Sequence, residues 1–96
     1  MKVYLGCLAP HVGPPRPDQM CLVWREVARE QDPLRVIEYT CECEDTVHEL
    51  CREAGLAYIC RITRLDGVVQ SVHETYRWRF KEAQDVWIAL LKGEAR

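Results

Sequence analysis

The chain has 96 residues, of which 48% are hydrophobic and 29% are charged, and its formal net charge is −2. This length predicts a single domain, residues 1–96, with a core of modest size. The weakly acidic charge argues against a nucleic-acid binder, and no apolar run approaches the length of about 18 residues that a membrane span needs.

The N-terminal part predicts a strand, a loop and a helix. Apolar and polar residues alternate from Lys2 to Leu8, which is typical of a strand, whereas residues 9–17 hold four prolines and one glycine and predict a loop. Asp18 is a suitable helix N-cap. Met20, Val23, Trp24 and Val27 follow it at helical spacing. A helix over 19–30 is therefore favoured, and an alternating strand over the same residues is the competing interpretation.

The middle of the chain predicts a second strand and a second helix. Leu34 to Cys43 is rich in β-branched and aromatic residues, which favours a strand. Residues Thr46 to Glu49 match a capping box. Val47, Leu50, Cys51 and Ala54 then form an apolar helical face, which Gly55 would end.

The C-terminal part predicts a β-hairpin followed by a third helix. Asp66-Gly67 separates two strand-like runs, Leu56–Leu65 and Val68–Trp78, and indicates a two-residue turn that pairs Leu65 with Val68. This register places six residues on one face: Ile59, Leu65, Val68, Val72, Tyr76 and Trp78. The last helix is expected from Lys81 to Lys92, stopped by Gly93. Its buried stripe would be Ala83, Val86, Trp87, Leu90 and Leu91.

The resulting order, β-α-β-α-β-β-α, resembles the thioredoxin fold. The loop Ala9–Arg16 resembles the active-site loop of that family, with Val12 and Pro15 at the positions of its two cysteines. Gly55-Leu56 and Asp66-Gly67 resemble the family's residues before its third strand and at its hairpin turn. The resemblance implies an α/β, thioredoxin-like domain: a four-stranded mixed sheet flanked by three helices.

The same resemblance argues against catalysis. Thiol exchange needs a thiolate and a resolving thiol, which Val12 and Pro15 cannot supply, and the sequence has no Cys-x-x-Cys pair. The segment where the family keeps a cis-proline contains Cys60 and no proline. These observations favour a binding protein that needs no cofactor over an enzyme, and they rank dithiol exchange third, after protein binding and metal binding.

The favoured function is a protein-binding module that uses the proline loop, because prolines and a glycine fix the shape of a loop before binding. The predicted binding surface comprises His11, Val12, Gly13, Pro14, Pro15, Arg16, Tyr58 and Cys60. The partner is expected to be another protein, with a homodimer as a further option. Aromatic and basic residues alternate from Tyr76 to Lys81, but the aromatic face continues the hairpin core, so nucleic acid is not favoured.

The alternative function is metal binding through the six cysteines. Because the first residues lack an export signal, the expected location is the cytoplasm and the expected state of the cysteines is reduced. Cys7, Cys21 and Cys51 resemble three ligands of the thioredoxin-like [2Fe-2S] ferredoxins, with Cys41, Cys43 or Cys60 as the fourth. A second pattern, Cys41-x-Cys43-x4-His48-x2-Cys51, offers three thiols and an imidazole, a set typical of structural zinc.

Overall fold

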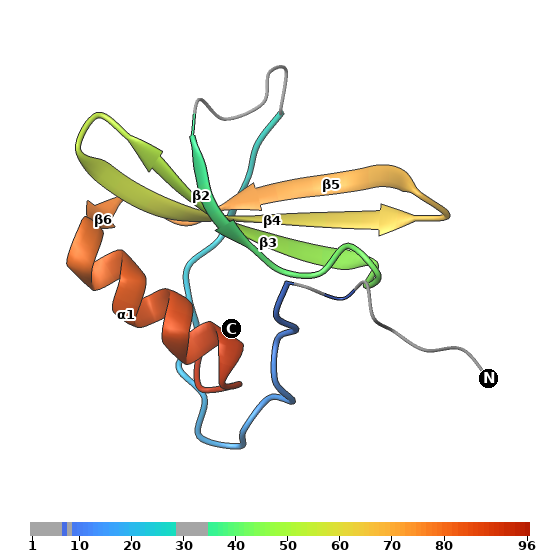
Figure 1. The fold of residues 1–96 in the computed structure, drawn as a ribbon, viewed down its shortest axis with the longest axis horizontal. Helices are drawn as coiled ribbons and strands as arrows, with labels where there is room; N and C mark the ends of the chain where they lie inside the picture. Colours follow the sequence, from blue (N-terminus) through green and yellow to red (C-terminus); the bar gives the residue numbers. More distant parts are fainter. Residues whose placement is uncertain (1–6, 8, 29–34) are drawn as a thin grey trace.

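The computed structural model describes residues 7, 9–28 and 35–96, which form an antiparallel sheet with one helix packed against one face (Figure 1). The elements in chain order are β1 (Arg25–Glu26), β2 (Val36–Tyr39), β3 (Thr46–Glu53), β4 (Leu56–Leu65), β5 (Val68–Glu74), β6 (Trp78–Arg79) and α1 (Phe80–Leu91). The strands lie in the order β1-β5-β4-β3-β2, and β6 also pairs with β4. Every strand pair is antiparallel.

This architecture overturns the predicted thioredoxin-like fold. That fold needs a mixed sheet flanked by three helices, whereas the described residues contain α1 as their one helix and a sheet that is antiparallel throughout. The strand predicted from Lys2 to Leu8 lies outside the described residues except for Cys7. The part of the chain that the structure describes is therefore predominantly β, with a single helix near the C-terminus.

The predicted helix after Thr46 is wrong, because these residues form β3. This strand lies between β2 and β4, and side chains on both of its faces are buried. Val47 and Cys51 point to one face of the sheet, while His48 and Leu50 point to the other. Burial on both faces produces apolar residues at spacings of three and four, which imitate a helical pattern.

The predicted helix over 19–30 is also wrong, because the described part of this segment is extended. Its backbone finds partners in the C-terminal residues: the Met20 N–H donates to the Glu94 carbonyl and the Leu22 N–H to the Arg96 carbonyl, both at 2.8 Å. Trp24 packs on the helix side of the sheet and Val27 on the other side, as alternation along an extended chain requires. The competing strand interpretation was closer, although only Arg25–Glu26 form a strand there.

The two-residue turns of the β3–β4 and β4–β5 hairpins have the same conformation. Ala54 and Gly55 have φ values of 49° and 81°, and Asp66 and Gly67 have 52° and 78°. Positive φ at both central residues is the requirement of a type I′ turn, which matches the twist of the flanking strands. The predicted turn at Asp66-Gly67 and the pairing of Leu65 with Val68 are confirmed, whereas Gly55 ends a strand and not a helix.

A β-bulge changes the predicted face of the second hairpin. Arg64 pairs with Val69 but Thr63 pairs with Ser71, so β5 carries one extra residue at this point. Beyond the bulge, Val72 lies opposite Ile62 and joins a cluster on the face away from α1. The prediction that Val72 shares a face with Ile59 is therefore wrong, since Ile59 faces the helix.

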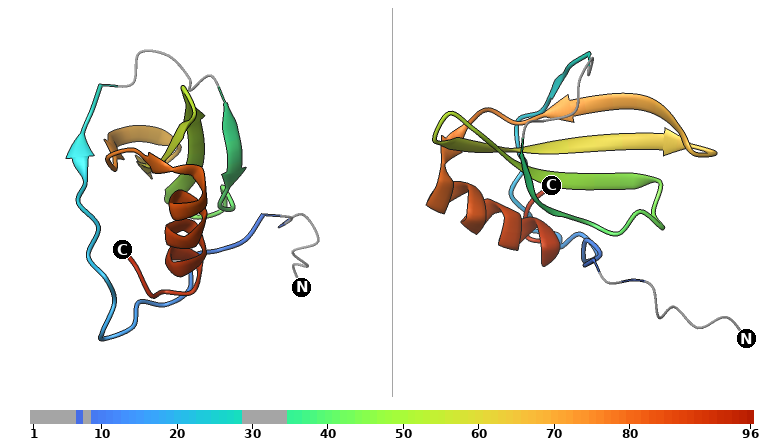
Figure 2. Two further views of the ribbon diagram at one scale, coloured as in Figure 1. Left: turned by 90° about the vertical axis from the view of Figure 1, so that its left-hand side faces the viewer. Right: turned by 45° about the horizontal axis from the view of Figure 1, so that its top comes forward.

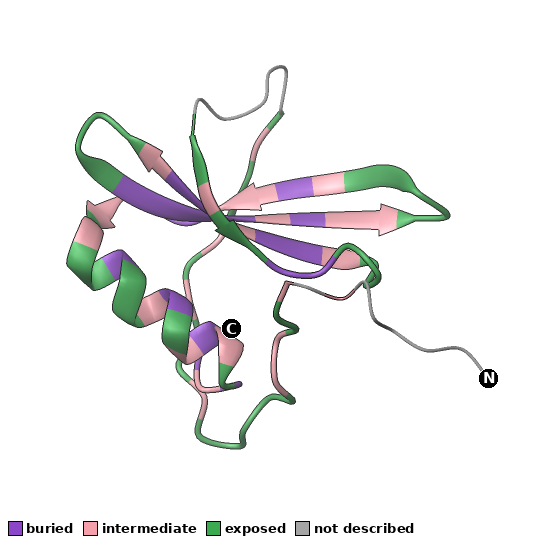
Figure 3. Ribbon diagram, in the orientation of Figure 1, coloured by how far each residue is buried: buried purple, intermediate pink, exposed green. Residues whose placement is uncertain are grey.

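The helix-side core contains the stripe that the sequence predicts for α1. Ala83, Trp87 and Leu90 are buried in this helix, and Val86 and Leu91 pack against them. Their partners in the sheet are Leu50, Ala57 and Ile59. Figure 3 shows the buried residues in the middle of the strands and on the side of α1 that faces the sheet. No helix of the described residues has the length and apolar character needed to cross a membrane.

A second cluster occupies the opposite face of the sheet, away from α1. Its buried members are Cys51, Tyr58, Cys60, Ile62 and Val72. Their strand positions alternate with those of the residues that face the helix.

Residues 9–22, here called the strap, run beside the C-terminal end of the chain (Figure 2). The Gly13 N–H donates to the Leu91 carbonyl at 2.8 Å, and the Arg16 N–H to the Gly93 carbonyl at 2.9 Å. Gly93 ends α1 with φ of 76°, as the sequence predicts for a helix stop. A Cβ on Gly93 would overlap the Pro14 carbonyl, so the two backbones touch at this point.

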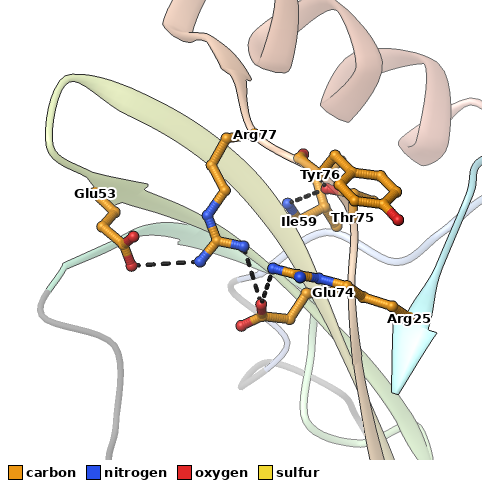
Figure 4. A network of polar contacts seen from close by, with 7 residues as sticks. All are labelled: Arg25, Glu53, Ile59, Glu74, Thr75, Tyr76 and Arg77. Carbon is orange, nitrogen blue, oxygen red and sulfur yellow. Dashed lines mark hydrogen bonds and ion pairs between the residues drawn. The ribbon is translucent and has the colours of Figure 1, made fainter. Parts of the chain in front are cut away.

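A polar network joins β5 to β6 at the edge of β4 (Figure 4). Thr75 bridges the break between the strands, because its hydroxyl accepts from the Ile59 N–H at 3.0 Å while its own N–H donates to the Ile59 carbonyl at 2.9 Å. The Arg77 guanidinium donates to Glu74 at 3.0 Å and to Glu53 at 3.3 Å. Its charge is therefore matched by two carboxylates.

Candidate metal centre

Four side chains with metal-binding atoms meet at one end of the sheet. The Sγ atoms of Cys7, Cys41 and Cys43 and a ring nitrogen of His11 all lie within 4.8 Å of one another. Ligands around a tetrahedral zinc ion are about 3.5–4 Å apart, given Zn–S and Zn–N bonds of about 2.3 and 2.0 Å. Movements of about 1 Å would therefore bring the four atoms into coordination. This cluster can hold a metal ion.

Cys41 and Cys43 lie in the turn between β2 and β3, and hydrogen bonds hold this turn in place. The Arg64 guanidinium, from β4, donates to the Glu42 and Glu44 carbonyls at 2.9 and 3.1 Å. The Arg64 N–H donates to the Asp45 carbonyl at 2.8 Å. A single residue of β4 thus binds three backbone carbonyls of the turn.

Two further contacts connect this turn to the strap and to β3. The Cys41 N–H donates to the Pro10 carbonyl at 2.9 Å, which brings the segment carrying Cys7 and His11 against the turn. At the base of the turn, the Thr40 N–H donates to the His48 carbonyl and the His48 N–H donates to the Thr40 hydroxyl, both at 2.9 Å. Backbone hydrogen bonds therefore hold the turn that carries Cys41 and Cys43, and one of them joins this turn to Pro10, next to His11.

The three thiols of the cluster do not behave alike. A hydrogen bond from the Cys43 backbone N–H, with help from His11, lowers the pKa of Cys41 to about 7. The hydrogen bond between the two side chains favours ionisation of Cys41 and raises the pKa of Cys43 to about 12. The Cys41 side chain also raises the pKa of Cys7. Cys41 is therefore the first thiolate of the cluster, and a metal ion would displace the remaining protons.

The His11 ring is oriented for ligation. Its Nε2 lies 3.2 Å from the Cys43 Sγ, and its Nδ1 lies 4.0 Å from the Glu44 carboxylate. Metal-binding histidines commonly direct their second nitrogen to a carboxylate, which fixes the tautomer that coordinates the metal. At 4.0 Å, Glu44 is too far for a hydrogen bond and would have to move by about 1 Å to become this partner.

The structure brings together only part of each predicted ligand set. Cys7, Cys41 and Cys43 meet, but Cys21 is exposed in the strap and Cys51 is buried in the cluster on the far face of the sheet. His48 points to the helix side and is not part of the group. The fourth ligand is His11, which sequence reasoning assigned only to a binding surface. The spacing Cys7-x3-His11 was the signal that could have identified it.

The predicted protein-binding surface is divided between the two faces of the sheet. Val12 packs against the helix-side core, and the loop from His11 to Pro15 lines a cleft on that side. Tyr58 and Cys60 are buried in the cluster on the opposite face. Binding of a protein partner by His11–Arg16 stays a prediction, as does a cytoplasmic location.

Comparisons with known proteins leave the site as the only guide to function. No protein-family model, curated protein or solved structure matches this chain.

Proposed function

We propose that this chain is a small zinc-binding domain in which Cys7, His11, Cys41 and Cys43 hold one structural zinc ion. The observation that supports the proposal is the convergence of these four ligand atoms within 4.8 Å. They come from two segments that are about 30 residues apart in the sequence, so local chain geometry alone does not account for their meeting.

The donor set favours zinc over other ions. Thiolates and imidazoles suit zinc, whereas magnesium and calcium require oxygen ligands. Four protein ligands complete a tetrahedral shell and leave no position for water or substrate, which is the arrangement of structural and not catalytic sites. An iron–sulfur cluster on Cys7, Cys21 and Cys51 is not supported, because Cys21 and Cys51 lie outside the group.

The metal would fasten the start of the strap to the sheet. Around the site, Cys7 and Ala9 are only half-buried, and Pro10 and His11 are exposed, so burial of apolar surface holds this segment weakly. Zinc would provide the missing attachment, because the free energy of metal binding adds to the free energy of folding.

Elemental analysis of protein purified without oxygen tests this proposal. The wild type should contain about one zinc ion per chain, and Co²⁺ substitution should give the absorption bands of a tetrahedral site with thiolate ligands. Cys41→Ser and His11→Gln should each reduce the zinc content and lower the melting temperature. Cys21→Ser is the matched control, since Cys21 is an exposed thiol outside the cluster.

Two results would contradict a zinc site at this position. One is wild-type protein that contains no zinc and gives no thiolate–cobalt absorption after reconstitution. The other is a loss of zinc in Cys21→Ser that equals the loss in Cys41→Ser. Iron in place of zinc would keep the site and change the assigned metal.

A further inference from the structure

A cleft of about 480 Å³ lies beside the metal centre, between the strap and the helix side of the sheet. Its floor is formed by two directly opposed pairs of β3 and β4, Thr46 with Thr63 and His48 with Arg61. Pro14, Pro15 and Leu90 contribute apolar surface. This volume and this combination of apolar walls with a few polar groups are typical of sites for small molecules.

His48 is the most deeply buried polar group of the floor. Its side chain is 6% exposed, and neither ring nitrogen has a hydrogen-bond partner among the described residues. Burial and the charges of Arg61 and Arg96 lower its pKa to about 4, so the ring is neutral at pH 7. A neutral imidazole offers one donor and one acceptor, and leaving either unpaired in a buried position costs about 1–3 kcal/mol.

Among the described residues, Arg61 carries a positive charge that no carboxylate balances. Its guanidinium lies 3.9 Å above the Trp24 ring and makes no ion pair within the described part of the chain. Burial and the nearby charge of Arg96 both lower its pKa, whereas Arg77 on the other face is surrounded by Glu74 and Glu53 (Figure 4). A partly buried cation beside a second cation favours an anion at this place.

Two carboxylates also line the cleft, but neither of them forms an ion pair with Arg61. Glu44 and Asp45 are both exposed, and Glu44 faces His11 of the metal centre at 4.0 Å. Water and salt screen exposed charges strongly, so these two groups weaken the attraction of the partly buried Arg61 for an anion only a little.

We propose that this cleft binds a small molecule through an oxyanion, a phosphate or a carboxylate, which pairs with Arg61 and Arg96 and hydrogen-bonds to His48. A guanidinium can hold such a group with two parallel hydrogen bonds, and the neutral imidazole contributes one donor. The prolines of the strap form a rigid wall, which keeps the ordering cost of binding low. This inference goes beyond the proposed metal site and does not depend on which metal is bound there.

Titration of the full chain with simple anions, followed by NMR of the Arg61 and His48 side chains, tests the proposal. Inorganic phosphate, acetate and chloride are added separately at constant ionic strength, to the protein as purified and with its metal content measured. Phosphate or acetate should shift both side-chain signals with saturation, and the tighter of the two identifies the oxyanion class. Chloride should produce no saturable shift.

Substitutions identify the groups that bind the anion. Arg61→Gln and Arg96→Gln should each weaken binding by about tenfold or more, the equivalent of one charge-assisted hydrogen bond. Arg96 is exposed, so its substitution should leave the fold intact. Arg52→Gln is the matched control, because that guanidinium stacks on Phe80 at 4.5 Å and lies outside the cleft. The affinity of Arg52→Gln for phosphate or acetate should stay within about twofold of the wild-type value.

Three outcomes would overturn the proposal. They are the absence of a saturable response to phosphate or acetate, a response that chloride reproduces, and a loss of anion affinity in Arg52→Gln that equals the loss in Arg61→Gln. Metal content is measured on the same samples, so a missing zinc ion and a missing anion site are recognised separately. Anion binding in metal-free protein would support the cleft, while the reconstitution with cobalt decides the zinc site separately.

Discussion

Gly93 occupies a position where no other residue fits without a shift of the backbone. Its φ is 76°, and a Cβ would overlap the carbonyl of Pro14 in the strap. The positive φ costs any L-residue about 1 kcal/mol. The overlap of the Cβ with Pro14 forces the strap and the end of α1 apart. It therefore weakens the hydrogen bonds between Arg16 and Gly93 and between Gly13 and Leu91.

We therefore expect Gly93→Ala to lower the free energy of unfolding by about 2–3 kcal/mol, measured by urea denaturation. Gly55→Ala is the control, because Gly55 has a similar φ of 81° but nothing lies within 4 Å of the added carbon. Its cost should be about 1 kcal/mol. Equal losses in the two variants would mean that the contact with Pro14 contributes nothing.

His48 makes stability depend on pH. Burial, Arg61 and Arg96 lower its pKa from the ordinary 6.5 to about 4 in the folded protein. The unfolded chain therefore takes up a proton at a higher pH than the folded chain. The contribution of neutral His48 to the free energy of unfolding is fully present above pH 6.5. It decreases as the pH falls below 6.5 and is lost completely near pH 4.

Between pH 7 and pH 5 this single group should reduce the free energy of unfolding by about 2 kcal/mol. The comparison of wild type with His48→Phe isolates the effect of His48, because the other titratable groups, the candidate metal ligands included, affect both proteins alike. The free energy of unfolding of the wild type minus that of His48→Phe should fall by that amount between pH 7 and pH 5. A difference that stays constant with pH would contradict the assignment.

At the scale of the element, α1 depends on its apolar stripe and not on its ends. Arg79 at its N-cap makes no side-chain capping bond, and its last turn carries no basic residue. Packing of the stripe on Leu50, Ala57 and Ile59 therefore provides most of its stability.

Leu90→Ala should lower the free energy of unfolding by about 3 kcal/mol, because Leu90 is fully buried in this stripe. Ile88→Ala is a control of equal size on the same helix, and its side chain is 49% exposed. Its effect should stay within about 0.5 kcal/mol. Thermal or urea denaturation measures both, and similar losses would mean that α1 is not held by this face.

The elements that the sequence predicted correctly are those with a local signal. Asp66-Gly67 fixes its turn through backbone conformation, and the stripe of α1 repeats over a full 12 residues. β3 was mistaken for a helix because a central strand is buried on both faces, a property set by neighbours and not by its own residues. The bulge in β5 opposite Thr63 and Arg64 contains no glycine that would indicate it in the sequence. The sequence therefore did not predict that Val72 lies on the face away from α1.

At the scale of the whole molecule, the same limit explains the candidate sites. Cys41 and Cys43 were recognised because they are close in sequence, whereas their meeting with Cys7 and His11 depends on how the strap returns to the sheet. The cleft that contains His48 and Arg61 depends on the register of β3 with β4. It also depends on the hydrogen bonds between the strap and the C-terminal residues. These contacts join segments that are far apart in the sequence and follow from the tertiary structure. They could not be predicted from the sequence, because the predicted fold was wrong.

The pairing of the strap with the C-terminal residues also orders events during synthesis on the ribosome. Gly13 and Met20 bind residues 91–96, so these contacts cannot form until the last part of the domain has emerged. The four metal ligands, by contrast, all lie within the first 43 residues. All four residues of the proposed zinc site therefore leave the ribosome before the C-terminal residues that the strap binds, although Arg64, which holds the turn of Cys41 and Cys43, follows later.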